Sequence, residues 1–212
     1  MYIPAHFEEN DPAALAALMA AHSFALLITV DGDGLPFVTH QPLLYDARHG
    51  AKGRLIGHIA RANPQWQHFA SAKPVLAVFQ GPHAYISPSW YANRPAVPTW
   101  NYAAVHVYGT PRIIEDQARV RTMLDRRAQT YEAGNAKPWR LADEPDNFLA
   151  GMQRGIVAFE IPVDRLEGKW KMSQNRKPED REGAIAALCA QGGADNLATA
   201  EIMARLLATT PR

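Results

Sequence analysis

The stretch FALLITVDGDGLPFVTHQPLLY (residues 24–45) decides the fold. It contains two apolar runs, 24–30 and 36–45, and the polar sequence DGDG at 31–34 separates them. Glycine and aspartate are the residues that tight hairpin turns favour, because they accept backbone conformations that other residues avoid. The stretch therefore predicts a β-hairpin near the start of the chain.

Outward from this hairpin, strands and helices of unequal length follow without regular alternation, which argues against a doubly wound parallel sheet. The pattern predicts a mostly antiparallel barrel with helices packed around it, and a Pro-rich loop over 81–98 that is long for a compact domain. Further strands are expected at 54–59, 75–80, 97–110 and 156–161. Helices are expected to begin at Pro12 and Pro64 and to cover 116–131, 145–154, 182–189 and 197–207.

Composition narrows the class of protein. The 212 residues carry 22 Lys and Arg against 21 Asp and Glu, a formal charge of +1 that excludes a strongly basic surface overall. Cys189 is the only cysteine, which excludes an intramolecular disulfide and suggests a reducing compartment. An acidic N-terminal segment and the lack of any apolar run of ~20 residues predict a soluble, unprocessed, cytoplasmic protein without a membrane partner.

Several common catalytic motifs are absent from the sequence. It has no Gly-x-Gly-x-x-Gly, Walker-type loop, His-Glu-x-x-His, Gly-x-Ser-x-Gly or Cys-x-x-Cys. This argues against a dinucleotide dehydrogenase, a P-loop enzyme and a serine hydrolase. All eight histidines fall at or before His106. Four of them, His40, His58, His83 and His106, lie on or beside separate predicted strands and lack the spacing of metal ligands, so no metal site is predicted.

Three segments carry side chains suited to ligand binding. Residues 57–66 (GHIARANPQW) place an arginine at a strand end beside a helix N-terminus, which suits an anion, although an ordinary turn would have the same sequence. Residues 97–102 (VPTWNY) combine two aromatic rings with an amide, which suits a planar heterocycle or equally a core or dimer contact. Residues 169–176 (KWKMSQNR) would either close over a ligand or form a solvated connector.

Taken together, segments 57–66, 79–91, 97–102 and 169–175 resemble the PaiB family, described as FMN-binding negative transcriptional regulators. The resemblance implies an antiparallel split β-barrel of the flavin-reductase and pyridoxamine-oxidase-like type, with peripheral helices and a C-terminal helix pair. It also implies a homodimer with FMN in a groove between the subunits. The barrel would span 1–176, and a helical extension would span 177–212.

The resemblance also implies which residues contact the cofactor. Thr39 and His40 would lie beside the flavin ring, and His58, Ala60, Arg61 and Asn63 would serve the ribityl phosphate. Trp100, Asn101 and Tyr102 would line the groove from either subunit, and Lys171, Ser173 and Gln174 would complete it. Gln41 departs from the apolar residue expected before Pro42, so contacts to the ring edge would change.

Three functions remain open at the level of sequence. One is a flavin-dependent oxidoreductase, for which the residues identify no catalytic acid or base. Another is a repressor that binds DNA directly, but Arg205 is the only base in 196–207, the second helix of the C-terminal pair, and a recognition helix usually carries several donors. The third is a related barrel that binds haem through a histidine.

Overall fold

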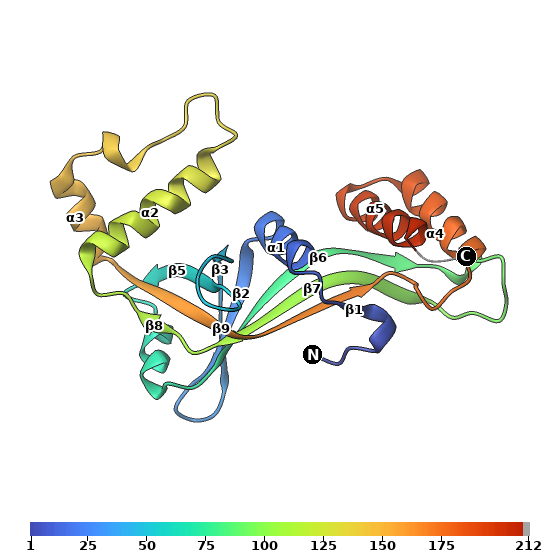
Figure 1. The fold of residues 1–212 in the computed structure, drawn as a ribbon, viewed down its shortest axis with the longest axis horizontal. Coiled ribbons are helices and arrows are strands. Elements are labelled where there is room, and N and C mark those ends of the chain that lie inside the picture. The colour runs from blue at the N-terminus through green and yellow to red at the C-terminus, as the bar shows by residue number, and fades with distance from the viewer. Residues whose placement is uncertain (210–212) are drawn as a thin grey trace. The chain divides into compact units, whose positions relative to one another are not determined.

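The computed structural model describes residues 1–209, and its strands form an open antiparallel sheet with helices at its periphery (Figure 1). The strand order is β3-β2-β6-β7-β9-β5-β4, and β1 and β8 pair with β9 outside this path. This confirms the fold class expected from the sequence. The strands are β1 (Glu8–Glu9), β2 (Phe24–Val30), β3 (Pro36–Pro42), β4 (Leu44–Asp46), β5 (Arg54–Ala60), β6 (Val75–Ile86), β7 (Thr99–Gly109), β8 (Arg112–Ile113) and β9 (Ile156–Lys171).

The helices follow the expected pattern of two central and two C-terminal segments. Within residues 1–209, none of them has both the length and the apolar character needed to cross a membrane. The α-helices are α1 (Pro12–Ala21), α2 (Gln117–Glu132), α3 (Asp146–Arg154), α4 (Pro178–Gln191) and α5 (Ala194–Ala208). The short 3-10 helices are η1 (Ala5–Phe7), η2 (Pro64–Ser71), η3 (Pro88–Trp90) and η4 (Leu141–Asp143).

The hairpin is confirmed over 24–42, but the predicted second strand ends at Pro42, and Leu44–Asp46 form β4, which pairs with β5. Strands β2 and β3 pair in antiparallel register from Phe24 opposite Pro42 to Val30 opposite Pro36. The Asp31 carboxylate accepts hydrogen bonds from the backbone N–H groups of Asp33 and Leu35 and so holds the turn. This is the local role for which aspartate is favoured in turns.

Strand β6 runs through the first part of the predicted loop 81–98 and ends at Ile86. Gly81 permits this, because a Cβ atom there would lie 2.9 Å from Leu18 Cδ1 and 3.1 Å from the Ala103 carbonyl oxygen. The backbone therefore passes closer to its neighbours than a larger residue would allow. Strand β9 likewise continues to Lys171 instead of ending at residue 161, and it carries the KWK sequence into the sheet.

The chain divides into two compact units, which are described separately. Unit 1 comprises residues 1–18, 79–106 and 167–212, and unit 2 comprises residues 19–78 and 107–166. Residues on both sides of the boundary predicted at 176/177 fall in unit 1, and the division into a barrel and an extension stays a prediction. In unit 1, α4 and α5 pack side by side (Figure 1).

A core in unit 2 fixes helix α2 against the sheet. Val120 and Met123 on α2 pack with Leu44 on β4, Ile56 on β5 and Ala158 on β9, and all five are buried. Because side chains alternate along a strand, His58 on β5 lies on the same face as Ile56. The helix that covers this core therefore also lies close to His58.

Candidate functional site

The anion-binding segment predicted at 57–66 forms a strand-to-helix junction at the end of β5. The Asn63 side chain accepts a hydrogen bond from the Gln65 N–H (3.0 Å), which caps η2, and Pro64 is its first residue. The Asn63 amide nitrogen donates to the Thr39 hydroxyl (3.0 Å). The structure thus brings together two of the predicted cofactor residues, although they are 24 positions apart in the chain.

Arg61 follows this strand, and its exposed side chain makes hydrogen bonds through two of its three nitrogens. Its Nε donates to the Arg154 carbonyl and its Nη2 to the Ile156 carbonyl, each at 2.8 Å. These are its side-chain hydrogen bonds within residues 1–209, so Nη1 can still donate to a ligand. Arg61 and Trp66 line a cavity of about 290 Å³ that also contacts β8 and α3.

The Gln65 side chain fastens η2 to the hairpin. It is fully buried, and its Nε2 lies 2.9 Å from the Leu27 carbonyl oxygen, 3.1 Å from the Phe37 carbonyl oxygen and 3.2 Å from Thr29 Oγ1. Buried hydrogen bonds of this kind fix a segment because leaving their partners unpaired costs about 1 to 3 kcal/mol each. Asn63 is held in place by the same contacts, since it lies two residues away.

Strand β3 places the predicted residues His40 and Thr39 on opposite faces. Thr39 pairs with the fully buried Leu27, whereas His40 is exposed, with its ring centre 6.2 Å from that of Phe24. Gln41 is 5% exposed, and within the described residues neither of its amide atoms has a hydrogen-bond partner. The residue that departs from the family pattern is therefore a buried polar group that a ligand would satisfy.

His58 lies in a different environment from Thr39 and Asn63. It lines a pocket together with residues of α2 and α3. Burial, together with the nearby Arg127 guanidinium, lowers the pKa of His58 from 6.5 to about 4. Ala60, two residues along the same face of β5, is exposed and offers a ligand only its backbone and methyl group.

In unit 1, three predicted groove residues serve internal contacts. Asn101 and Ser173 are buried and hydrogen-bonded to each other at 3.0 Å, and the Asn101 amide also lies 3.3 Å from the sulfur of Met203 on α5. The Gln174 amide oxygen accepts from the Met172 N–H, and its nitrogen donates to the Trp170 carbonyl. These three side chains shape the end of β9, and their contact with a cofactor stays a prediction.

The other predicted residues of unit 1 form an accessible aromatic and cationic surface. Trp100 is 54% exposed, and its ring centre lies 6.0 Å from that of Tyr85 and 6.2 Å from that of His83. The Lys171 ammonium donates to the Thr99 hydroxyl and the Trp100 carbonyl, and burial and the neighbouring Lys169 lower its pKa. Lys169 also lies 5.2 Å from the ring centre of Tyr102.

Arg127 on α2 was not among the predicted site residues, although it lines the same pocket as His58. Its side chain is buried, and Nη1 donates to the Pro42 carbonyl at 2.8 Å. The sequence did contain a signal, because Val120, Met123 and Arg127 follow helical spacing and define one buried face. A charged residue on the buried face of a helix requires a hydrogen-bond or ion-pair partner, so its position can be identified from the sequence.

Residues 1–209 contain no group of three or more His, Cys, Asp or Glu side chains placed to hold a metal ion. The donors near β3 and η2 are instead a guanidinium, an amide and a hydroxyl. Such neutral and cationic donors are suited to anions.

An open antiparallel barrel with peripheral helices is the fold of the split-barrel flavoproteins, and solved structures show the same architecture. The FAD and heme binding protein from Mycobacterium smegmatis has a TM-score of 0.59 and 19% identity, covering 88% of this chain and 80% of that one. The flavocytochrome Anf3 from Azotobacter vinelandii has a TM-score of 0.58 and 14% identity, covering 80% and 72%. At these identities the likeness establishes the fold alone.

The sequence comparisons establish the family. Residues 1–165 match the family described as "Putative FMN-binding domain". The chain is also 35% identical over 205 residues to the protease synthase and sporulation protein PAI 2 of Bacillus subtilis, covering 96% of both chains. The chain therefore belongs to the PaiB family of FMN-binding domains, which confirms the family and the cofactor expected from the sequence.

The residues present fit FMN. A phosphate requires cationic and N–H or O–H donors, and Arg61 Nη1, Asn63 and Thr39 supply them around the end of β5. The buried, unsatisfied amide of Gln41 lies on the same face of β3 as Thr39 and offers both a donor and an acceptor. The exposed aromatic surface around Trp100 fits one face of a planar ring.

Proposed function

We propose that the chain is a cytoplasmic FMN-binding protein that works as a homodimer. In this proposal, Arg61, Asn63 and Thr39 of one copy hold the ribityl phosphate, with Ala60 contributing its backbone. Trp100, Tyr102 and Lys171 of the second copy face the flavin ring. The hydrogen bond between Asn63 and Thr39 at the end of β5 carries the proposal, because it joins the predicted phosphate junction to the predicted ring strand.

The involvement of a second copy is supported by surfaces that one copy leaves open. On β2 and β3, Phe24, Val30 and Val38 are 68%, 56% and 47% exposed. Apolar side chains gathered on one sheet face are typical of protein interfaces. His40 shares this face, so its predicted contact with the flavin would be made at the interface.

FMN would supply electron or hydride transfer when bound. The chain's own contribution would be orientation and charge: Arg61 neutralises the phosphate, and the Lys171 ammonium favours negative charge on a nearby ring. No side chain identified in the candidate site is placed as a general acid or base. We therefore propose a redox or regulatory flavoprotein without assigning a reaction.

A regulatory role through direct DNA reading has less support than flavin binding. The α4–α5 pair packs against the sheet residues of unit 1, as the contact between Asn101 and Met203 shows. Arg205 is the only base in α5, whereas recognition helices use several donors for phosphates and base edges. A mobility-shift assay over a range of salt concentrations would reveal specific binding.

The flavin proposal is tested by titrating FMN into purified protein and following quenching of flavin fluorescence. Arg61→Gln is expected to weaken FMN binding at least tenfold, which is about 1.4 kcal/mol. Asn63→Asp keeps the helix cap but removes the donor and adds a negative charge, so it is also expected to weaken binding. Arg140→Gln is the control, because Arg140 is exposed and its ion pair within residues 1–209 is with Asp143. Equal FMN affinity in all four proteins would contradict the proposal.

The dimeric groove is tested by subunit complementation. Arg61→Gln and Lys171→Ala proteins are each expected to bind FMN poorly. Mixed dimers formed by unfolding and refolding the two together would contain one site with both wild-type residues, and FMN binding should partly return. If each site is built from a single copy, mixing restores nothing.

A further inference from the structure

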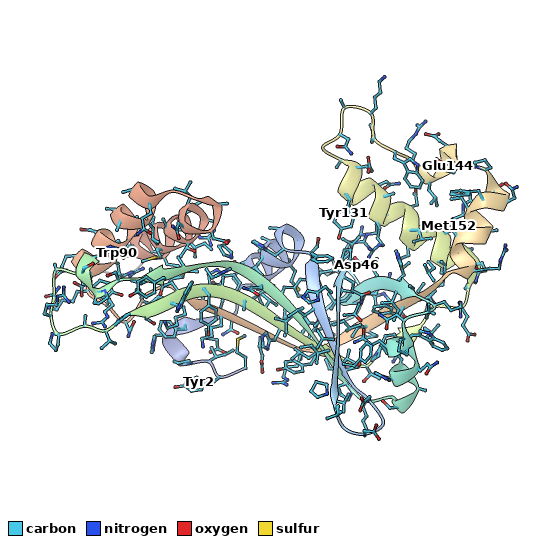
Figure 2. All side chains as sticks on the ribbon, turned by 180° about the vertical axis from the view of Figure 1, so that it is seen from behind. Tyr2, Asp46, Trp90, Tyr131, Glu144 and Met152 are labelled. Atoms are coloured by element: carbon cyan, nitrogen blue, oxygen red, sulfur yellow. The ribbon has the colours of Figure 1, made fainter. Side chains whose placement is uncertain are left out.

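A pocket in unit 2 lies between α2 and α3. Neither Arg61 nor Asn63 lines it, although it shares Gln153 and Ile156 with the cavity that Arg61 lines. The volume of the α2–α3 pocket is about 370 Å³, which is within the range of ~300 to 1,000 Å³ typical of small-molecule sites. Tyr131 on α2 and Met152 on α3 line it from the two helices (Figure 2). Trp139 and Phe148 also line it, and these four side chains are each 43% to 60% exposed.

A buried positive charge also lines this apolar pocket. Arg127 is 7% exposed, and its hydrogen bond within residues 1–209 is to the Pro42 carbonyl, with no carboxylate in ion-pair contact. The two buried carboxylates nearby in the fold, Asp46 and Glu160, are paired with other arginines. Burying a cation without a counter-charge is unfavourable, so an anion in the pocket would be strongly favoured.

His58 adds a second polar group to the pocket without adding charge at neutral pH. Its Nδ1 is buried and has no hydrogen-bond partner within the described residues. Its pKa of about 4 keeps the imidazole neutral near pH 7, so it can donate or accept one hydrogen bond. The pocket has no acidic lining residue, and its net charge is therefore +1.

These observations define the ligand by charge and shape. A single guanidinium balances a monoanion, whereas a phosphate dianion would leave a negative charge in an apolar enclosure. The planar fork of an arginine matches a carboxylate. The rings of Tyr131, Trp139 and Phe148 offer faces and edges to an aromatic body.

We propose that the α2–α3 pocket is a second ligand site, which binds an aromatic monocarboxylate with its carboxylate on Arg127 and its ring among the aromatic side chains. Of the residues that the family resemblance assigns to FMN, His58 alone lines this pocket, and the proposed function rests on Arg61, Asn63 and Thr39 instead. The pocket is therefore expected to bind ligand in both the FMN-free and the FMN-saturated protein.

The test uses 4-phenylbutyrate as the probe and 4-phenylbutan-1-ol as its uncharged counterpart, measured by isothermal titration calorimetry with the full chain. The acid is expected to bind with a Kd of about 1 mM or tighter. The alcohol is expected to bind at least tenfold more weakly, because it cannot pair with the guanidinium. FMN should remain bound throughout the titration, as its absorption spectrum would show.

Two matched variants separate the pocket from general charge effects. Arg127→Met removes the charge with little change in volume and should reduce affinity for the acid at least tenfold. Arg121→Met removes the same charge from the same helix outside the pocket, where Arg121 pairs with the exposed Asp146, and should change affinity less than twofold. If Arg127→Met does not fold, Phe148→Ala at the half-exposed mouth should still weaken binding of the acid.

Four outcomes would overturn the proposal. One is equal affinity for the acid and the alcohol, and another is full affinity in a folded Arg127→Met protein. The third is release of FMN by the probe, which would make the pocket part of the flavin site. The fourth is the absence of probe binding in a protein that still binds FMN, as expected if a second copy covers this face; that outcome would leave the proposed flavin function intact.

Discussion

Two neighbouring arginines on α2 have opposite surroundings. Arg126 pairs with Asp46 at 2.7 Å, and Asp46 also contacts Arg54, which in turn pairs with Glu160 at 2.6 Å. Glu160 also pairs with Arg119 at 3.2 Å, and we call Asp46, Arg54, Arg119, Arg126 and Glu160 the charge network. Arg127 is more deeply buried than Arg126 and has no such partner. Charges balanced within the chain stabilise the fold, whereas a charge left unbalanced indicates a place where something else binds.

The largest effect should come from opening the charge network. Asp46→Asn leaves Arg126 and Arg54 without their shared counter-charge and should lower the free energy of unfolding by about 2 to 4 kcal/mol. Arginine contacts lower the pKa of Asp46, so its stabilisation is complete above the ordinary carboxyl range and is lost as the pH falls. Urea unfolding at pH 7 measures the loss, and an unchanged midpoint and slope would contradict this role.

The pocket should be sensitive to acid through His58. Its folded pKa of about 4 is below the unfolded value of 6.5, so the unfolded chain takes up a proton first and stability falls with pH between these values. The loss between pH 7 and pH 5 should be about 2 kcal/mol. His58→Phe should flatten this slope, whereas His49→Phe at an exposed position should retain it. Identical slopes in all three proteins would rule out a depressed pKa.

The two arginines themselves provide the direct comparison. Arg126→Met removes a partner of Asp46 and should cost about 1 to 2 kcal/mol, because a buried carboxylate is left underpaired. Arg127→Met removes a desolvated charge together with one hydrogen bond, so stability should stay within about 1 kcal/mol of the wild type. Thermal unfolding of the pair without ligand ranks them, and the reverse order would show that Arg127 is a structural residue.

The smallest effect is expected at the surface. Arg140 and Asp143 form a paired contact with side chains 69% and 52% exposed. Asp143→Asn should leave the urea midpoint almost unchanged, because exposed ion pairs gain little in water. If Asp143→Asn lowered the stability as much as Asp46→Asn does, burial would not explain why the charge network stabilises the fold more than a surface ion pair.

Much of the fold was predictable because local signals agreed with it. The DGDG turn and the two apolar runs specified the hairpin, and Asn63 followed by Pro64 specified the start of η2. Boundaries were less accurate where tertiary contacts overrode local sequence. Gly81 and Pro82 read as a loop, but close packing beside Ala103 keeps that segment in β6.

Site residues could be predicted only where the residue type and its position in the sequence together indicate a single local role. Asn63 was identified from its capping position, but its hydrogen bond to Thr39, 24 residues away in the chain, was not predicted. Nothing local to Arg61 reveals that two of its nitrogens bond the carbonyls of Arg154 and Ile156, more than 90 residues away. The adjacent residues Arg126 and Arg127 are of the same type. Only their positions around the axis of α2 show that Arg127 lies on the buried face and Arg126 does not.

The buried amide of Gln65 has a consequence for the motions of the molecule. It joins η2 to β2 and β3 through contacts with Leu27, Thr29 and Phe37, so η2 cannot detach while the hairpin stays closed unless these bonds break. Amide protons of residues 65–71 should therefore exchange with solvent in step with those of the hairpin. The junction at Asn63 should therefore lose its structure only as often as the β2–β3 hairpin opens.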